Sequence, residues 1–219
     1  MRLLNVSRLV SLILLGAVAA LSTPTDEILH RVEGHYNSAR TLSVGFVESY
    51  SMLGHPREPE SGTLTLRKSG KMRWDYAKPK GKLFISDGKN VFLFTAQDNR
   101  VERWKLKDTE DMRAPLAFLL GRMEMKKEFQ NFSTHPGEGG IWLDAVAKND
   151  RAPYEKVEML VFPDSSIHAL KIFGRDGSVL SYTFRGERLN EAAPESLFRF
   201  TVPTGAEVVD SVSVDGQGS

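Results

Sequence analysis

The chain has 219 residues, 41% of them hydrophobic, with 29 basic and 28 acidic residues and a formal net charge of +1. This length suffices for one substantial domain or two small ones. The near-neutral charge gives no support for nucleic-acid binding through phosphate neutralisation, so we expect no nucleic-acid partner. Cysteine is absent, which excludes a disulfide framework and a thiolate-ligated metal.

The N-terminal segment has the composition of a secretory signal. Arg2 and Arg8 precede an uncharged apolar run over 9–21, and small residues suited to a signal peptidase follow. We expect residues 1–22 to be cleaved, with an uncleaved anchor as the alternative. Cleavage removes two arginines and no acidic residue, which lowers the formal charge from +1 to −1. The chain also lacks the cysteine that lipid modification requires, so we expect a soluble protein beyond the inner membrane.

The first predicted elements are a helix and a strand. Thr23 or Thr25 can cap a helix with acidic residues in its first turn. Its apolar residues recur at helical spacing: Ile28, Leu29, Val32 and Tyr36. The stretch 41–50 then alternates as a strand whose apolar side holds Leu42, Val44 and Phe46. Residues 52–60, with one glycine and two prolines, are predicted to be a loop.

Residues 61–90 carry three successive alternating runs, which indicate consecutive antiparallel strands. Their apolar residues are Leu64 and Leu66, then Met72, Trp74 and Tyr76, then Leu83 and Ile85. Asp87-Gly88-Lys89-Asn90 has the composition of a tight turn, and a further hairpin is expected about Asp98-Asn99. One face of this sheet is therefore predicted to be apolar.

The rest of the chain contains a helix and then more strands. Residues 114–125 predict a short, very apolar helix, followed by strands over 126–133, 140–148, 154–162, 167–173 and 178–185. A last apolar pattern over 197–202 precedes a polar tail. Because helices and strands do not alternate, we expect a mainly β fold. It is a single curved antiparallel sheet of about eleven strands, an unclosed barrel, covered by short α-helices.

Catalytic signals are weak in this sequence. His30 and His35 are five residues apart on the predicted helix, which places them on different faces, and no nucleophile elbow, zinc motif, phosphate loop or dinucleotide fingerprint is present. We therefore expect no enzyme activity, no cofactor and no metal. A hydrolase stays the weaker hypothesis, since residues assembled across a sheet are invisible in one sequence.

A binding function has a positive argument. The predicted sheet has more apolar face than two short helices need to cover, and such an excess could line a cavity. The alternative is an ordinary core in which the same residues touch one another. Periodicity leaves both interpretations open.

The residues then resemble a known family. Ser61-Gly62-Thr63-Leu64, Arg67-Lys68, Met72-Arg73-Trp74-Asp75-Tyr76, Pro79, Leu83, Ser86-Asp87-Gly88-Lys89 and Val91 are similar to the LolA family of outer-membrane lipoprotein carriers. Pro115, Leu116, Leu119 and Leu120 resemble its lid segment, and Phe198, Phe200, Pro203 and Gly205 resemble its closing strand. The resemblance covers nearly all of the chain after residue 22 and is looser over 129–185.

The resemblance implies a periplasmic carrier that binds the acyl chains of lipoproteins and is a monomer. It would receive acylated lipoproteins from an inner-membrane ABC exporter and deliver them to an outer-membrane acceptor. The carrier domain would span 23–208, before a flexible tail over 209–219. The predicted cavity residues are Leu42, Val44, Phe46, Leu64, Leu66, Met72, Trp74, Leu83 and Ile85. The predicted lid residues are Ile28, Val32, Tyr36, Leu116, Phe118, Leu119 and Leu120.

The chain departs from the family at one position. In the family an arginine beside a proline hydrogen-bonds the lid, and here the matching pair is Lys68-Ser69. Lysine keeps the charge without the planar fork of donors, so Lys68 is a candidate for a weaker or differently made latch, and a plain surface charge is the alternative. Arg67 or Arg73 could replace it.

Rival functions on the same fold are an outer-membrane acceptor, an envelope regulator, and a periplasmic carrier or sensor of another lipid, such as a glycolipid or free lipid. The missing lipidation cysteine argues against the acceptor, and the short chain against the regulator.

Overall fold

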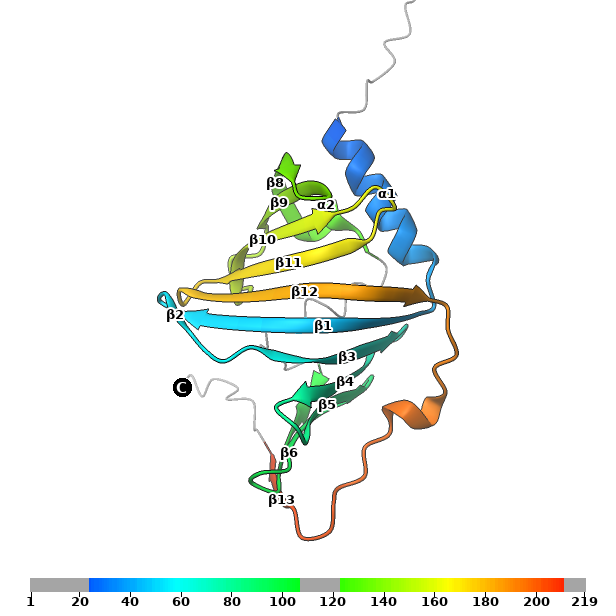
Figure 1. Ribbon diagram of the computed structural model, residues 1–219, viewed down its shortest axis with the longest axis vertical. Coiled ribbons are helices and arrows are strands. Elements are labelled where there is room, and N and C mark those ends of the chain that lie inside the picture. The colour runs from blue at the N-terminus through cyan, green and yellow to red at the C-terminus, as the bar shows by residue number, and fades with distance from the viewer. Residues whose placement is uncertain (1–23, 107–122, 211–219) are drawn as a thin grey trace, which may run out of the picture.

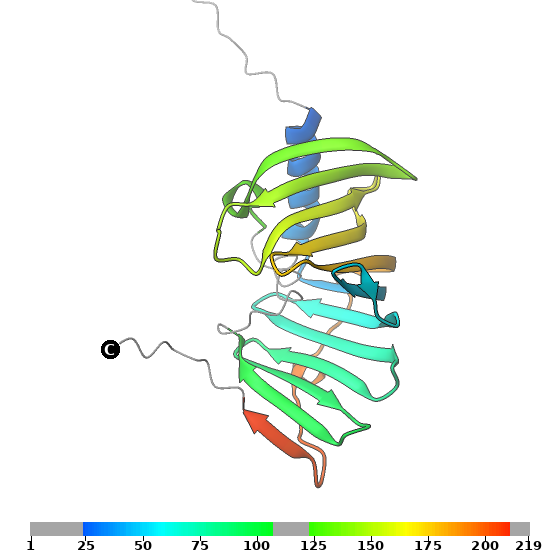
Figure 2. The same ribbon diagram turned by 90° about the vertical axis from the view of Figure 1, so that its left-hand side faces the viewer.

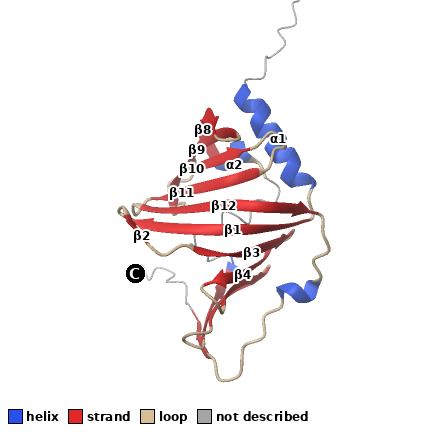
Figure 3. Ribbon diagram, in the orientation of Figure 1, coloured by secondary structure: helices blue, strands red, loops and turns tan. Residues whose placement is uncertain are grey.

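The structure is a computed structural model, and it describes residues 24–106 and 123–210. Across these residues one large curved sheet dominates, with few helices (Figure 1; Figure 3). The described helices are α1 (Pro24–Ser38), α2 (Met125–Glu128) and the 3-10 helix η3 (Glu195–Phe198). The predicted signal peptide and four predicted lid residues, Leu116, Phe118, Leu119 and Leu120, lie outside the described residues.

The described part of the chain forms a 13-stranded sheet. Its strands are β1 (Thr41–Met52), β2 (His55–Pro56), β3 (Glu60–Arg67), β4 (Lys71–Lys78), β5 (Lys82–Asp87), β6 (Asn90–Thr95), β7 (Arg100–Lys105), β8 (Phe129–Gly137), β9 (Gly140–Ala147), β10 (Tyr154–Val161), β11 (Ile167–Gly174), β12 (Ser178–Leu189) and β13 (Glu207–Asp210). The order across the sheet is β13-β7-β6-β5-β4-β3-β1-β12-β11-β10-β9-β8, with β2 paired to β1 only. The two edges do not pair with each other, so the sheet curves without closing (Figure 2).

The chain builds this sheet from two meanders that meet at β1 and β12. Tight turns make the meanders possible, and two of them depend on glycine. Gly88, between β5 and β6, has φ +94°, and Gly177, between β11 and β12, has φ +82°, a region that glycine adopts without steric penalty. The turn at Gly88 was predicted from its composition, and the mainly β, open, curved sheet with few helices is confirmed.

The structure differs from the sequence prediction in several details, and α2 occupies the start of the strand predicted over 126–133. The segment expected to be a loop contains β2, whose two residues extend the β1 hairpin. The predicted closing strand over 197–202 is wrong, because η3 occupies its start and the last strand is β13, after Gly205. β13 also pairs with β7 in parallel, whereas the other pairings of the described sheet are antiparallel.

Helix α1 packs its predicted stripe against the sheet. Its buried residues are Ile28, Leu29, Val32 and Tyr36, and they join one apolar cluster with side chains from the strands. Both α1 and α2 contact β8, at the upper end of the sheet in Figure 1. The C-terminal arm, orange to red in Figure 1, descends from β12 through η3 to β13.

Candidate functional site

The candidate site is the sheet face that carries this apolar cluster, which we call the inner face. Cross-strand partners place their side chains on the same face of an antiparallel sheet. Leu64 in β3 is opposite Val44 in β1 and Trp74 in β4, so these three residues share a face. The predicted residues that lie on this inner face, each 0–4% exposed, are Leu42, Val44, Phe46, Leu64, Leu66, Met72 and Trp74.

Two predicted cavity residues lie on the opposite, outer face. The register pairs Trp74 with Phe84, so Phe84 points inward, while Ile85 is opposite Arg73 and Leu83 is opposite Asp75. The placement of Leu83 and Ile85 on the inner face is therefore wrong. The sequence prediction assigned Leu83 and Ile85, instead of Phe84, to the inner face. Three consecutive apolar residues give β5 no clear alternation, because both faces of this strand are covered.

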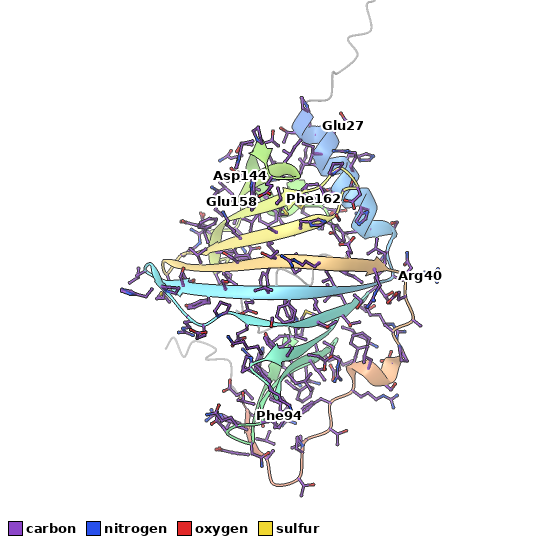
Figure 4. All side chains as sticks on the ribbon, in the orientation of Figure 1. Glu27, Arg40, Phe94, Asp144, Glu158 and Phe162 are labelled. Atoms are coloured by element: carbon purple, nitrogen blue, oxygen red, sulfur yellow. The ribbon has the colours of Figure 1, made fainter. Side chains whose placement is uncertain are left out.

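A second, smaller apolar layer explains why Leu83 and Ile85 are apolar. Ile85 is opposite Phe92, and Leu83 is opposite Phe94, which Figure 4 labels at the lower end of the sheet. Phe200 of the C-terminal arm packs against this layer, with ring centroids 5.1 Å from Phe92 and 6.3 Å from Phe94. The protein therefore covers the apolar residues on this part of its outer face with its own chain.

An aromatic cluster occupies the centre of the inner face. The ring of Phe46 lies edge-on to Trp74 at 4.8 Å and to Tyr76 at 5.3 Å between centroids. Trp74 also approaches Tyr182 of β12 at 5.5 Å, and Tyr182 stacks on Phe184 at 5.7 Å. Such offset and edge-to-face pairs are favourable beyond their buried area. The cluster joins the two meanders of the sheet.

A few polar atoms interrupt this apolar surface. Glu48 of β1 is only 4% exposed and is opposite Tyr182, which places it on the inner face. The hydroxyl of Tyr76 donates a hydrogen bond of 3.5 Å to the Glu48 carboxylate. Trp74 is 0% exposed, and its indole Nε1 has no hydrogen-bond partner in the described part of the chain. The inner face is thus apolar with a polar spot.

Polar side chains fasten α1 to the sheet. The Tyr36 hydroxyl donates to Glu187 of β12 at 2.8 Å and accepts a hydrogen bond from the backbone N–H of Ile167 at 2.8 Å. Burial, followed by the nearby Glu187 carboxylate, raises the pKa of Tyr36, so the hydroxyl keeps its proton. His35 contacts the other carboxylate oxygen of Glu187 at 2.7 Å. These contacts hold the predicted lid residues of α1 in place.

Lys68 also contacts α1. Its Nζ donates a 2.8 Å hydrogen bond to the backbone carbonyl of Asn37, in the last turn of α1, where a cation is favourable. The Asn37 side chain accepts from the Met123 amide at 2.6 Å and donates to the Met123 carbonyl at 2.9 Å. Lys68 lines a surface pocket of about 860 Å³ with Arg40 and Arg67, at the end of the sheet where Figure 4 labels Arg40.

The second meander supplies inner-face residues that the sequence prediction did not name. They include Leu143, Val157, Met159, Leu170, Ile172, Leu180, Tyr182 and Phe184. Alternation in each of these strands was the available signal. Glu48 was also missed, although it falls on the even-numbered side of β1 with Phe46.

The outer face of β9–β11 is polar by contrast. Glu158 accepts hydrogen bonds from Lys156 at 2.7 Å and Lys171 at 3.2 Å, and it is opposite Asp144 (Figure 4). The Lys171 ammonium also lies 4.7 Å from the ring centroid of Trp142. Charged and aromatic side chains therefore face solvent on this half of the sheet.

Neither a metal-binding group of three acidic, histidine or cysteine residues nor a helix long and apolar enough to cross a membrane occurs within residues 24–106 and 123–210.

Comparison with known proteins agrees with this architecture. The family model of the outer membrane lipoprotein carrier protein LolA matches residues 37–201. An outer-membrane lipoprotein carrier protein of Dechloromonas aromatica is 30% identical over 78% of this chain and 82% of its own, and one of Cupriavidus pinatubonensis is 27% identical over 87% and 89%. The solved structure of an uncharacterised conserved protein from Thermus thermophilus has the same fold, with a TM-score of 0.51 and 15% identity over 86% of this chain and all of that one.

The matched residues include β1 to β12 and the inner face with its aromatic cluster. The chain belongs to the LolA family of outer membrane lipoprotein carrier proteins.

Proposed function

We propose that this protein carries lipoproteins by holding their acyl chains against the inner face of the sheet. The observation that supports this most is the inner face itself, a continuous apolar surface contributed by strands of both meanders. Membership in the LolA family supports the same function, because the relatives are named as lipoprotein carriers. A carrier or sensor of another lipid is not favoured, because these relatives are named as outer-membrane lipoprotein carriers.

The energetics of acyl chains require such a carrier. Burying one methylene group of an acyl chain is worth about 0.8 kcal/mol, so a molecule with several long chains leaves a membrane for water very slowly. A protein that offers an apolar face removes most of this penalty. The inner-face residues Leu64, Met72 and Trp74 would contact the chains directly, and the other predicted cavity residues on this face would extend the contact.

Release without an energy source requires a second, empty state of comparable stability. A ligand shifts such an equilibrium only by the difference in its affinity for the two states. We propose that α1, with Ile28, Val32 and Tyr36, is one of the covering elements and that Lys68 stabilises its closed position through Asn37. The arginine of the family would then be replaced by a lysine that reaches a helix carbonyl instead of offering a planar fork.

The partners and location follow from the same proposal. An inner-membrane lipoprotein-releasing exporter would load the protein, and an outer-membrane acceptor would unload it. The periplasm is the compartment between these membranes, and the N-terminal signal segment supports export to it. The carrier would act as a monomer and would catalyse no reaction.

The test compares two buried residues on opposite faces of neighbouring strands. Leu64→Ser removes an inner-face side chain, and Ile85→Ser removes an outer-face side chain of similar size; both should lower the free energy of unfolding by about 3 kcal/mol. Binding of a synthetic diacylated lipopeptide is measured by calorimetry at a temperature where both variants stay folded. We expect Leu64→Ser to weaken binding severalfold and Ile85→Ser to leave it unchanged. Equal binding by both variants and the wild type would show that the inner face is only a core.

A further inference from the structure

The polar atoms of the inner face include one donor whose acceptor is missing. Trp74 lies at the centre of the aromatic cluster and is 0% exposed, yet its Nε1 has no acceptor within the described residues. The large majority of buried side-chain polar atoms in proteins are hydrogen-bonded, and each exception calls for a physical reason. A donor left unpaired in a buried position destabilises a protein, because it has lost its hydrogen bonds to water and gained none. A bound molecule that brings an acceptor would remove this penalty.

The surroundings indicate which group would fit. An indole nitrogen can donate one hydrogen bond and cannot accept one. The adjacent ring of Tyr76, 6.5 Å from Trp74 between centroids, already directs its hydroxyl to the Glu48 carboxylate. This polar spot therefore contains the Tyr76 hydroxyl and the Glu48 carboxylate, which hydrogen-bond to each other, and the Trp74 N–H, which has no acceptor among the described residues. The group that complements it is an acceptor.

A carboxyl group already present at the spot makes an anionic acceptor a poor fit. Glu48 is 4% exposed, and a second carboxylate placed beside it in an apolar setting would be strongly unfavourable. A free fatty acid, which ends in a carboxylate, fits poorly for this reason. A neutral carbonyl at the head of an acyl chain fits well, because ester and amide carbonyls accept hydrogen bonds without carrying charge.

We propose that the indole N–H of Trp74 donates a hydrogen bond to the neutral carbonyl through which an acyl chain of the cargo is linked. This inference rests on the proposed carrier function and deepens it. The apolar residues bind the chain, and Trp74 sets the depth at which the chain begins. The inner face then distinguishes linked acyl chains from free fatty acids and from plain hydrocarbon.

The experiment removes the N–H and keeps the ring. Site-specific incorporation of benzothienylalanine in place of Trp74 substitutes sulfur for the indole N–H with little change of shape, and Trp74→Phe is the genetically simple companion. The probes are dipalmitoylglycerol, which has two ester carbonyls, and dihexadecylglycerol, its ether analogue without them. Replacement of Trp142, on the outer face beside Lys171, is the matched control.

We expect the benzothienylalanine protein to bind the diester about tenfold more weakly than the wild type does, which corresponds to one lost hydrogen bond. Its affinity for the diether should equal that of the wild type. Replacing Trp142 should change neither affinity. An equal change for the two lipids, or no change for the diester, would overturn the inference and leave the carrier function intact. A wild type that binds neither of these lipids nor the diacylated lipopeptide would instead count against the carrier function.

Discussion

The two faces of strands β4–β6 both carry large apolar side chains, and they are covered in different ways. On the outer face, Phe92 and Phe94 are packed against Phe200 of the C-terminal arm, so a segment of the protein itself accounts for that layer. On the inner face, Trp74 and its neighbours belong to a much larger cluster that extends to β8. That cluster contains buried polar atoms, one of them a donor without a partner among the described residues.

The difference shows how to separate a core from a binding face. A layer made only to stabilise the fold is covered by the chain's own residues, and its polar groups find partners there, as Arg73 and Asp75 do on the outer face. A face made to receive a ligand contains polar atoms whose partners the protein does not supply. The first two predictions below each perturb one face, so that each serves as the control for the other.

The largest expected effect is on the inner face. Phe46→Ala removes the ring that contacts both Trp74 and Tyr76, and it should lower the free energy of unfolding by about 4 kcal/mol. Urea denaturation followed by circular dichroism measures this loss. Lipopeptide binding should fall as well, at a temperature where the variant remains folded. A loss below about 1 kcal/mol would mean that the cluster is loosely packed.

The outer layer should respond in stability alone. Phe198 ends η3, which contacts β4 and β5, and it is 1% exposed without belonging to the inner-face cluster. Phe198→Ala should lower the free energy of unfolding by about 3 kcal/mol, because the short arm can partly collapse into the space. Lipopeptide affinity of the folded variant should equal that of the wild type. A large loss of affinity would contradict the separation of the two faces.

A smaller effect is expected where α1 joins the sheet. Tyr36→Phe removes the hydrogen bond to Glu187 and leaves the buried N–H of Ile167 without its acceptor, which should destabilise the protein by about 1–3 kcal/mol. Ser38→Ala, at an exposed position of the same helix, should change stability by less than about 0.5 kcal/mol. Thermal unfolding of the two variants side by side checks the prediction, and equal melting temperatures would refute it.

The Lys68 contact should have a local effect. Lys68→Met removes the hydrogen bond to the Asn37 carbonyl and should destabilise the last turn of α1 by about 1 kcal/mol. Amide hydrogen exchange over residues 34–38 should become faster, and Lys68→Arg should restore most of the protection. Unchanged exchange in Lys68→Met would show that Lys68 is a surface charge without a latch role.

The smallest effect concerns the charged outer face. Partial burial raises the pKa of Glu158, whereas hydrogen bonds from Lys156 and Lys171 lower it. The lowering is the larger effect, so the pKa lies below its ordinary value. The resulting stabilisation is present above the unfolded-state pKa of about 4.3 and is lost as the pH falls through the folded-state pKa. Solvent screening limits it to a few tenths of a kcal/mol.

Glu158→Gln should therefore lower stability slightly at neutral pH and make stability less dependent on pH in the acidic range. Chemical denaturation at a series of pH values measures this slope. A variant with the same slope as the wild type would show that the two lysines do not stabilise the carboxylate.

Much of the fold was predictable from local pattern. Alternation identified the strands, and residue composition located short turns such as Asp87-Gly88-Lys89-Asn90. Both signals depend only on neighbouring residues, so one sequence is enough to read them. The sequence did not reveal β13, which pairs in parallel with β7 through contacts distant in the chain. The closing strand was misplaced for the same reason, since η3 packs on β4 and β5 and its residues are apolar without being in a strand.

The candidate site was predictable where alternation was clean. In β1, β3 and β4, apolar residues alternate with polar or small ones for most of each strand. The seven predicted cavity residues of these strands lie on one face, as expected. In β5 the consecutive Leu83, Phe84 and Ile85 gave no preferred phase, and only the pairing of Trp74 with Phe84 resolves it. Three apolar residues in succession were themselves a signal of a strand covered on both faces.

The most direct test of the central claim places a lipid tail relative to the two faces. Two proteins are made that each keep a single tryptophan, Trp74 on the inner face or Trp142 on the outer face, with phenylalanine at the other two positions. A diacylated lipopeptide with brominated acyl chains quenches the fluorescence of an indole that it contacts. We predict strong quenching of Trp74 and none of Trp142. Quenching of Trp142 alone, or of neither, would contradict the claim that the inner face holds acyl chains.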